Sequence, residues 1–154
     1  MKQQNQYFLF ELDGQRYAME ISVVERVIHA VELISLPETP DSLLGLINVG
    51  GKIIPFVNIR KKFNLPAREM NLDDRIIISR ISTRKIAFIA DNVEGIVEFS
   101  KEQIDDVHQS FPEMERYIVG VGRFNDNTVL IIAIDKLFST QNINRLEKVI
   151  KEQD

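Results

Sequence analysis

Short apolar segments separated by turn residues dominate the chain. They are rich in Ile, Val, Phe and Tyr, a composition typical of β-strands. Pairs of such segments flank short turns and predict four hairpins: 7–12 with 17–21, 47–49 with 52–59, 75–81 with 85–90, and 119–124 with 129–134. Four hairpins indicate a mostly antiparallel, all-β protein.

Only the last residues carry a longer helical pattern. Ile143, Leu146 and Ile150 recur at spacings of three and four between polar residues, which predicts a short amphipathic α-helix over residues 140–152. A stripe this short needs tertiary packing to be stable. We therefore interpret it as a C-terminal clamp in preference to a partner-binding helix.

Two segments recur in the same order, which indicates an internal duplication. Residues 17–27 align without gaps on 86–96 at an offset of 69, and residues 45–63 align on 120–138 at an offset of 75. The alternative is a chance likeness between segments rich in Ile and Val, which the shared order disfavours. Four aligned pairs are identical: Gly45/Gly120, Ile59/Ile134, Lys61/Lys136 and Phe63/Phe138.

Each copy holds about five short strands, and a flat sheet of this size could not bury both of its faces. Closure into a small barrel removes exposed sheet edges, so we predict two packed five-stranded β-barrels. The first copy would span residues 7–64 and the second 75–138, with the polar stretch 65–74 as the seam between them. The whole chain, 1–154, would form a single domain.

Composition is that of an ordinary globular protein, with 44% hydrophobic residues, 27% charged residues and a net charge of −4. Lys and Arg alternate with Asp and Glu along the chain, so we expect no nucleic-acid partner. The first six residues are polar, and no apolar run approaches the roughly 20 residues of a membrane span. We expect a cytoplasmic protein with no direct membrane insertion.

Residues suited to catalysis are sparse. The chain has no cysteine, which excludes thiolate chemistry and disulfides. His29 and His108 have no second ligand at metal spacing, and the adjacent acids at 73–74 and 105–106 would point to opposite sides of an extended chain. We expect no catalytic residue, no metal and no cofactor.

The chain resembles the CheW-like coupling proteins of bacterial chemotaxis from Tyr7 to Phe138. The resemblance rests on the opening strand Tyr7–Phe10 with Tyr17, the Pro37 turn, Asp91–Val93, and above all the run Gly45–Arg60 with its counterpart 120–138. It implies one CheW-like domain of two packed SH3-like barrels, in agreement with the duplication, and a scaffold without an active site.

The resemblance also implies partners. Members of this family join the cytoplasmic tips of methyl-accepting chemoreceptors to the regulatory domain of the histidine kinase CheA, which would recruit the protein to membrane-associated receptor arrays. A barrel edge and an apolar groove between barrels suit a strand or an amphipathic helix. The alternative is a regulatory or ligand-binding barrel protein outside chemotaxis, with its ligand in that groove.

Eight positions are candidates for receptor or kinase binding by this resemblance. Core packing is the alternative interpretation for the valines. The candidates are Val24, Arg26 and Val27, then Asn48, Gly50 and Gly51, and in the second copy Val93 and Ile96.

Two of these positions depart from the family pattern. Arg26 stands where the family commonly has an acidic residue, and Gly50 stands where it commonly has arginine. Charges at the rim of an interface chiefly tune specificity and encounter rate. We therefore hypothesise that the protein serves a non-standard set of receptors or kinases.

Overall fold

The computed structural model describes residues 4–37, 42–108, 112 and 115–138. The predicted helix over 140–152 lies outside these residues. The strands are β1 (Gln4–Leu12), β2 (Gln15–Glu20), β3 (Val24–His29), β4 (Leu43–Val49), β5 (Lys52–Val57), β6 (Arg75–Ile81), β7 (Arg84–Ala90), β8 (Asn92–Ser100), β9 (Ile118–Phe124) and β10 (Asn127–Ile132). Short helical turns are η1 (Ile21–Val23), α1 (Ile59–Lys62), η2 (Lys101–Gln103) and α2 (Ile134–Leu137).

All four predicted hairpins are present, as β1–β2, β4–β5, β6–β7 and β9–β10. Their turns use residues that tolerate positive φ. Asp13 and Gly14 have φ of 53° and 80°, and Gly50 and Gly51 have φ of 58° and 86°, values that suit the tight turns joining antiparallel strands.

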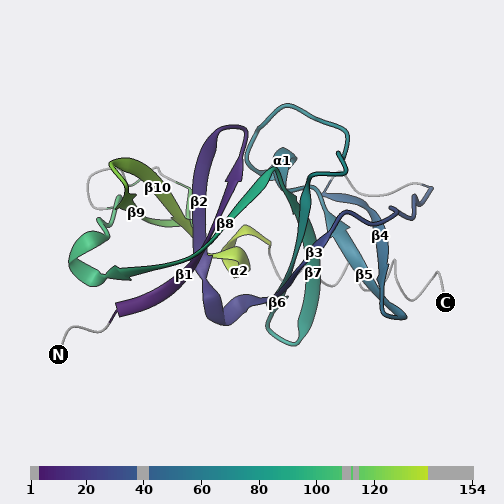
Figure 1. The fold of residues 1–154 in the computed structure, drawn as a ribbon, viewed down its shortest axis with the longest axis horizontal. Helices are drawn as coiled ribbons and strands as arrows, with labels where there is room; N and C mark the ends of the chain where they lie inside the picture. The colour runs from purple at the N-terminus through teal and green to yellow at the C-terminus, as the bar shows by residue number, and fades with distance from the viewer. Residues whose placement is uncertain (1–3, 38–41, 109–111, 113–114, 139–154) are drawn as a thin grey trace.

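The strands form two five-stranded sheets that lie side by side (Figure 1). Sheet A has the order β8-β1-β2-β10-β9, and sheet B has the order β3-β6-β7-β5-β4. In each sheet one pair is parallel, β2 with β10 and β5 with β7, and the others are antiparallel. The prediction of an all-β protein with two packed five-stranded units is confirmed.

The predicted division into barrels over 7–64 and 75–138 is wrong. Sheet A combines β1 and β2 of the first copy with β8, β9 and β10 of the second, and sheet B combines the remaining strands. Each copy thus contributes its first hairpin to one sheet and its last three strands to the other. Because the two orders match strand for strand, this exchange supports the duplication.

The connections between strands explain the exchange. Asp91 alone separates β7 from β8, and only the single helical turn η1 separates β2 from β3. A hairpin reversal takes at least two turn residues, so the chain continues from β7 into β8 without turning back. It therefore leaves one sheet and enters the other, as the long β8 ribbon in Figure 1 does.

The edge strands of each sheet are not joined by a ladder, so the barrels are open. A single antiparallel bridge approaches closure in each: Ile34 with Leu46 in sheet B and Asp105 with Val121 in sheet A. A Cβ at Gly45 would lie 2.4 Å from the carbonyl oxygen of Ile34. The glycine shared by the two copies is therefore required where the bridging segment crosses.

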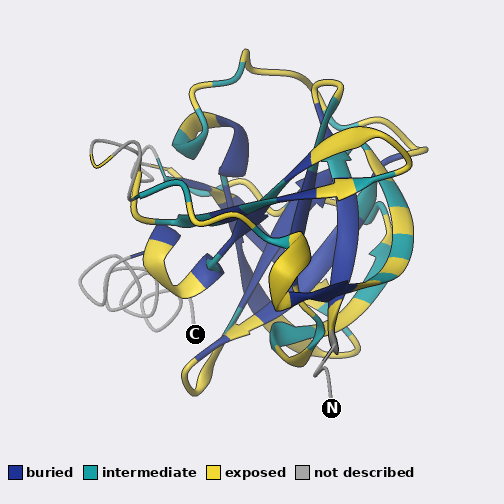
Figure 2. Cartoon of the chain, turned by 90° about the vertical axis from the view of Figure 1, so that its left-hand side faces the viewer, coloured by how far each residue is buried: buried dark blue, intermediate teal, exposed yellow. Residues whose placement is uncertain are grey.

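Buried side chains form three clusters. One is built from residues of sheet A, a second from residues of sheet B, and the largest lies between the sheets and includes residues of both, such as Phe10 and Phe88. We call this largest cluster the inter-sheet core. Figure 2 shows the buried residues concentrated in the strands and the exposed ones in the turns.

Candidate partner-binding surface

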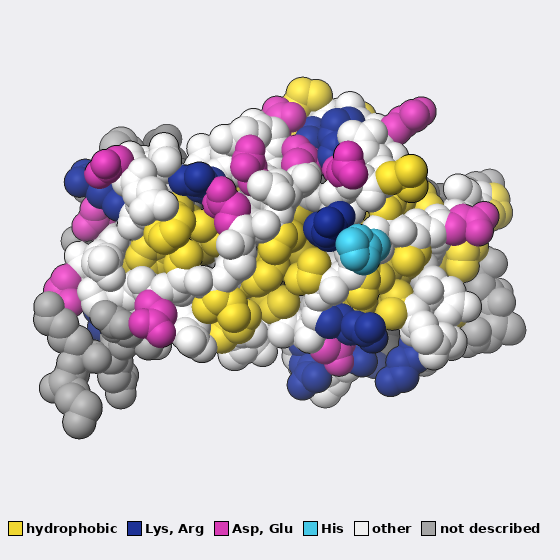
Figure 3. Space-filling model, in the orientation of Figure 1, with side chains coloured by type: hydrophobic (Ala, Val, Ile, Leu, Met, Phe, Trp, Pro, Cys, Tyr) yellow, Lys and Arg dark blue, Asp and Glu magenta, His cyan; other side chains and the backbone are white. Residues whose placement is uncertain are grey.

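The hydrophobic candidates lie on β3 and β8, the strands that follow the two crossings between sheets. Val24, Val27 and Val93 are half-buried and pack against the inter-sheet core. Ile96 is 58% exposed and pairs with Phe8 of β1. The three valines therefore contribute to packing, whereas Ile96 is open to a partner. Figure 3 shows further hydrophobic side chains in a band across one face of the molecule.

A β-bulge occurs at the same place in β3 and β8, with Glu25 and Glu94 as the extra residues. Lys85 Nζ lies 2.9 Å from Glu25 Oε1, and Arg16 Nη2 lies 2.9 Å from Glu94 Oε1. Glu25 and Glu94 are 69 positions apart, and so are Arg16 and Lys85; this is the offset of the repeat. The duplicated fold therefore builds the same ion pair twice, each time between the two copies.

Basic side chains surround Glu25. The hydrogen bond from Lys85, together with the charges of Lys85, Arg80 and Lys52, lowers the pKa of this carboxyl below its ordinary value. Arg26 follows it on β3 and is exposed, and no ion pair between described residues involves Arg26. The charge at this candidate position is thus available to a partner.

The polar candidates form the β4–β5 turn. Asn48 Oδ1 accepts a hydrogen bond of 2.9 Å from the backbone N–H of Gly51, which holds the turn. A Cβ at Gly50 would have no atom within 4 Å. A side chain at this position would therefore project into open space, and its absence leaves the turn uncharged.

Five of the eight candidates share one end of sheet B. Lys52, next to the β4–β5 turn, is close enough to act on the Glu25 carboxylate, so this turn and the start of β3 adjoin. The candidates that meet there are Val24, Arg26, Asn48, Gly50 and Gly51. The structure places Val93 and Ile96 on sheet A, and Val27 lies further along β3.

Sequence reasoning missed an ion network that ties the two sheets together. Arg60 Nη2 donates to Asp91 Oδ2 at 2.8 Å and Arg60 Nη1 to Asp13 Oδ1 at 3.2 Å, and the Arg60 side chain is only 6% exposed. Arg68 donates to Asp91 and to Asp74. Asp91 thus lies between two guanidinium groups at the point where the chain crosses from β7 to β8.

Opposing effects act on the Asp91 carboxyl. Burial favours its neutral form, but the backbone N–H of Asp13 and the guanidinium groups of Arg68 and Arg60 outweigh burial and lower its pKa. The same contacts with Asp74 and Asp91 raise the pKa of Arg68. The sequence signal is weak, because Arg60 directly follows the apolar run that ends at Ile59 but precedes two lysines. Only its burial shows that it needs an acidic partner.

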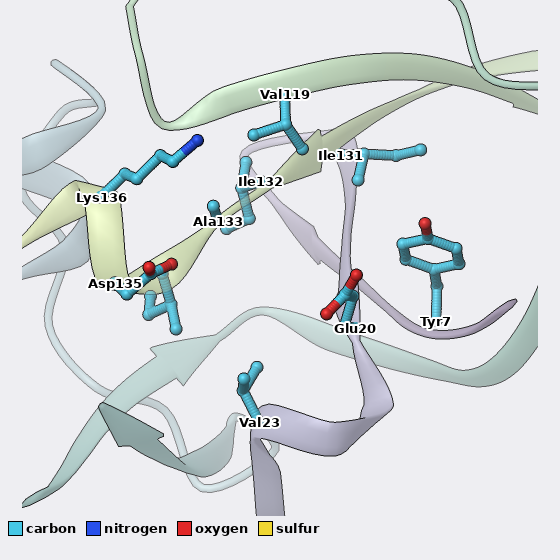
Figure 4. Close-up of a pocket in the computed structure, with 10 residues that line it drawn as sticks. Tyr7, Glu20, Val23, Val119, Ile131, Ile132, Ala133, Asp135 and Lys136 are labelled. Carbon is cyan, nitrogen blue, oxygen red and sulfur yellow. The ribbon is translucent and has the colours of Figure 1, made fainter. Parts of the chain in front are cut away.

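A cavity of about 310 Å³ lies beside β2, β10 and α2. Its walls include Val23, Val119 and Ile131. Asp135 and Lys136 line it on one side, and Glu20 lies beside Tyr7 on the other (Figure 4). The cavity can accept a small apolar group, and its carboxylates would favour a positive charge beside that group.

Within the described ranges, no group of three or more His, Asp or Glu side chains is arranged to hold a metal. His29 is exposed at the end of β3, and His108 Nε2 lies 2.6 Å from the carbonyl oxygen of Ile118. Among the described helical turns, none is long and apolar enough to cross a membrane.

The fold defines a class of protein: paired, open five-stranded β-units packed side by side. Comparison with known proteins specifies the family. The sequence model of the CheW-like domain matches residues 6–142, and the chain belongs to this family.

Relatives and a solved structure agree with this assignment. The chemotaxis protein CheW of Helicobacter pylori is 26% identical over 132 residues, which cover 86% of this chain and 80% of the relative. That of Thermotoga maritima is 27% identical over 130 residues, covering 83% of each. The crystal structure of the scaffolding protein CheW from Thermoanaerobacter tengcongensis has a TM-score of 0.77 and 28% identity, covering 92% of this chain and 96% of that one.

Proposed function

We propose that the protein is a non-catalytic adaptor that couples methyl-accepting chemoreceptors to the histidine kinase CheA. The match of the CheW-like domain over residues 6–142 carries this conclusion. The two-sheet fold supports it, since the similar solved protein is a scaffold. The adaptor would work in the cytoplasm, recruited to membrane-associated receptor arrays.

The surface of the chain offers two places for these partners. Ile96 is exposed on β8, an edge strand of sheet A, and Arg26 lies with the candidates of the β4–β5 turn at one end of sheet B. Separate surfaces on separate sheets allow two partners to bind at once. The inter-sheet core and the Asp91 network would hold the two surfaces in a fixed orientation relative to each other.

We further propose that the partners are a non-standard set. Arg26 is exposed and Gly50 leaves its turn uncharged. A partner adapted to an acid at position 26 and an arginine at position 50 would therefore meet a base at the first position and no charge at the second. Like charges placed opposite each other disfavour a complex. The partners of this chain would carry complementary changes.

Pull-downs with the full chain test both statements. The baits are the CheA regulatory domain and the cytoplasmic receptor tips of the host, alongside a CheA and receptor whose own CheW has the common acidic and arginine residues. Binding to a host kinase and a host receptor is the expected result, and binding to none of them contradicts the adaptor function.

The double variant R26E/G50R tests the partner set. It should gain affinity for the standard partners and lose it for the host ones, because it restores the common charges. Equal binding of the unmodified chain to both sets would refute the non-standard set. Ile96→Ser should weaken one partner only, whereas Leu72→Ser, a change at another exposed apolar residue (91% exposed), is the matched control.

A regulatory or ligand-binding role outside chemotaxis is the second candidate, and the cavity beside α2 favours it. A tight ligand at 100 times its dissociation constant adds roughly 2.7 kcal/mol to stability. A thermal-shift screen with small cationic and apolar compounds would reveal such a ligand. The adaptor function predicts no stabilising compound.

A further inference from the structure

One end of sheet B is strongly basic, although the protein as a whole carries a net charge of −4. This end consists of the β6–β7 turn, the start of β5 and the bulge of β3, and we call it the basic end. Its basic residues are Arg26, Lys52, Arg80, Arg84 and Lys85. With Glu25 as the one acid, these six side chains have a net charge of +4.

The duplicated fold contains its own control for this feature. Sheet A has an end with the same turns and the same bulge, and its residues pair in the same registers. The residues at the corresponding positions are Gly95, Asn127, Glu11, Gln15 and Arg16, with Glu94 in the place of Glu25. These six have a net charge of −1, so the fold itself does not require a basic end.

Only one ion pair is common to both ends, the one that holds the bulged glutamate: Lys85 with Glu25 and Arg16 with Glu94. Lys52 and Arg26 have no counterpart charge in sheet A. Arg80 lies 3.6 Å from Glu25 but is 59% exposed, an arrangement that contributes little to stability. Four of the five bases therefore have no equivalent base in sheet A, so the one ion pair that the two ends share does not account for them.

We infer that the basic end is a docking surface for an acidic segment of a protein partner. The inference rests on the proposed function, because it specifies the chemistry of one of the adaptor's partners. Charge complementarity identifies the occupant. Clustered Asp and Glu of the partner would pair with the exposed bases around Glu25. Glu25 itself would repel an acid placed opposite it and so determine how the partner segment is positioned.

A protein fits this surface better than nucleic acid or anionic lipid. Glu25 lies among the bases and would repel a continuous row of phosphates. Ile53, next to Lys52, is 36% exposed and offers an apolar contact that suits a protein side chain. A mixture of charged and apolar contacts is typical of protein interfaces.

Chemical-shift mapping by NMR tests the location directly. The labelled full chain is titrated with a glutamate-rich peptide, phosphatidylglycerol vesicles and duplex DNA. We expect the peptide to shift amides at 24–26, 49–53 and 80–85 and to leave the equivalent positions 11–16 and 93–95 unchanged. Shifts spread over both ends, or tighter binding to vesicles or DNA than to the peptide, would overturn the inference.

Variants test its strength. K52N/R84Q replaces two bases with the residues that sheet A carries at the same positions, and its urea midpoint checks that the fold is retained. We expect roughly tenfold weaker binding of the peptide and of one adaptor partner at low salt, and a smaller difference at high salt. The control K101Q/R123Q removes two exposed bases elsewhere and should change binding less than twofold; equal losses in both variants would overturn the inference.

The two proposals fail in different ways. If the peptide maps to the basic end while neither CheA nor a receptor binds, the adaptor function is wrong and the docking surface stands. If CheA and receptor both bind K52N/R84Q as tightly as the unmodified chain, the docking surface is wrong and the adaptor function stands.

Discussion

Asp91 is the residue through which the two sheets are most directly coupled, and Asp91→Asn tests that coupling. The substitution keeps the shape of the side chain but removes its charge. One amide oxygen can replace at most part of the three interactions with Asp13 N–H, Arg60 and Arg68. The amide NH₂ would in addition face a guanidinium group, with which it cannot pair.

The magnitude follows from the burial of Arg60. Removing one partner of a fully buried ion pair costs about 3–5 kcal/mol. Arg60 keeps two partners, the Asp13 carboxylate and the carbonyl oxygen of Pro66, and Asp91 itself is 24% exposed. We therefore expect Asp91→Asn to lower the free energy of unfolding by about 2–3 kcal/mol.

Urea denaturation at pH 7 measures this loss from the transition midpoint at constant slope. Asp73→Asn is the matched control, because Asp73 is exposed in the same seam and no contact of its carboxylate is found among the described residues. It should change stability by less than about 0.5 kcal/mol. Equal effects of the two substitutions would refute the role of the network.

The pH dependence provides a second check. The pKa of Asp91 is lowered in the folded state, so its contribution is fully present above the unfolded value of about 3.9 and disappears as the pH falls through the lower folded value. The difference between the unmodified chain and Asp91→Asn should therefore shrink below about pH 4. A difference of the same size at pH 7 and pH 3 would show that charge is not the cause.

Four further predictions concern packing. Gly45→Ala should destabilise the fold by about 3 kcal/mol, because its Cβ meets the rigid backbone oxygen of Ile34. Gly120→Ala should cost less, since the nearest atom to its Cβ is a methyl group of the Ile104 side chain at 2.6 Å and not a backbone atom. Urea denaturation in which Gly120→Ala is the more destabilising of the two would contradict this account. Val93→Ala should cost about 1 kcal/mol as a half-buried residue, whereas Ile96→Ser should change the midpoint by less than about 0.5 kcal/mol, and a large loss at Ile96 would mean that it is a packing residue.

Local features of the fold follow from the sequence. Each hairpin is encoded by its own apolar segments and turn residues, so β1–β2 and β6–β7 are predictable without knowledge of the rest of the chain. The duplication likewise appears in the alignment of 45–63 on 120–138. The shared Gly45 and Gly120 mark places where a backbone passes close by, although only the structure shows which backbone it is.

The pattern of apolar and polar residues does not predict the exchange of strands between the two copies. Because the two copies are alike, β3 suits the edge of β6 as well as that of β1, and apolar alternation does not distinguish the two pairings. Asp91 and Asn92 are themselves turn-type residues, so nothing in the sequence indicates that the chain continues from β7 into β8. The geometry of that connection decides the pairing, since a chain that cannot reverse must continue into the other sheet.

The all-β class, the hairpins, the duplication and the family follow from the order of residue types along the chain. Strand pairing in three dimensions is needed to learn which halves share a sheet, that Arg60 contacts Asp91, and that the bases at 26, 52, 80, 84 and 85 lie at one end. Along the sequence those bases alternate with acids. Contacts between distant positions form only when the strands pair, and strand pairing is a property of the whole fold.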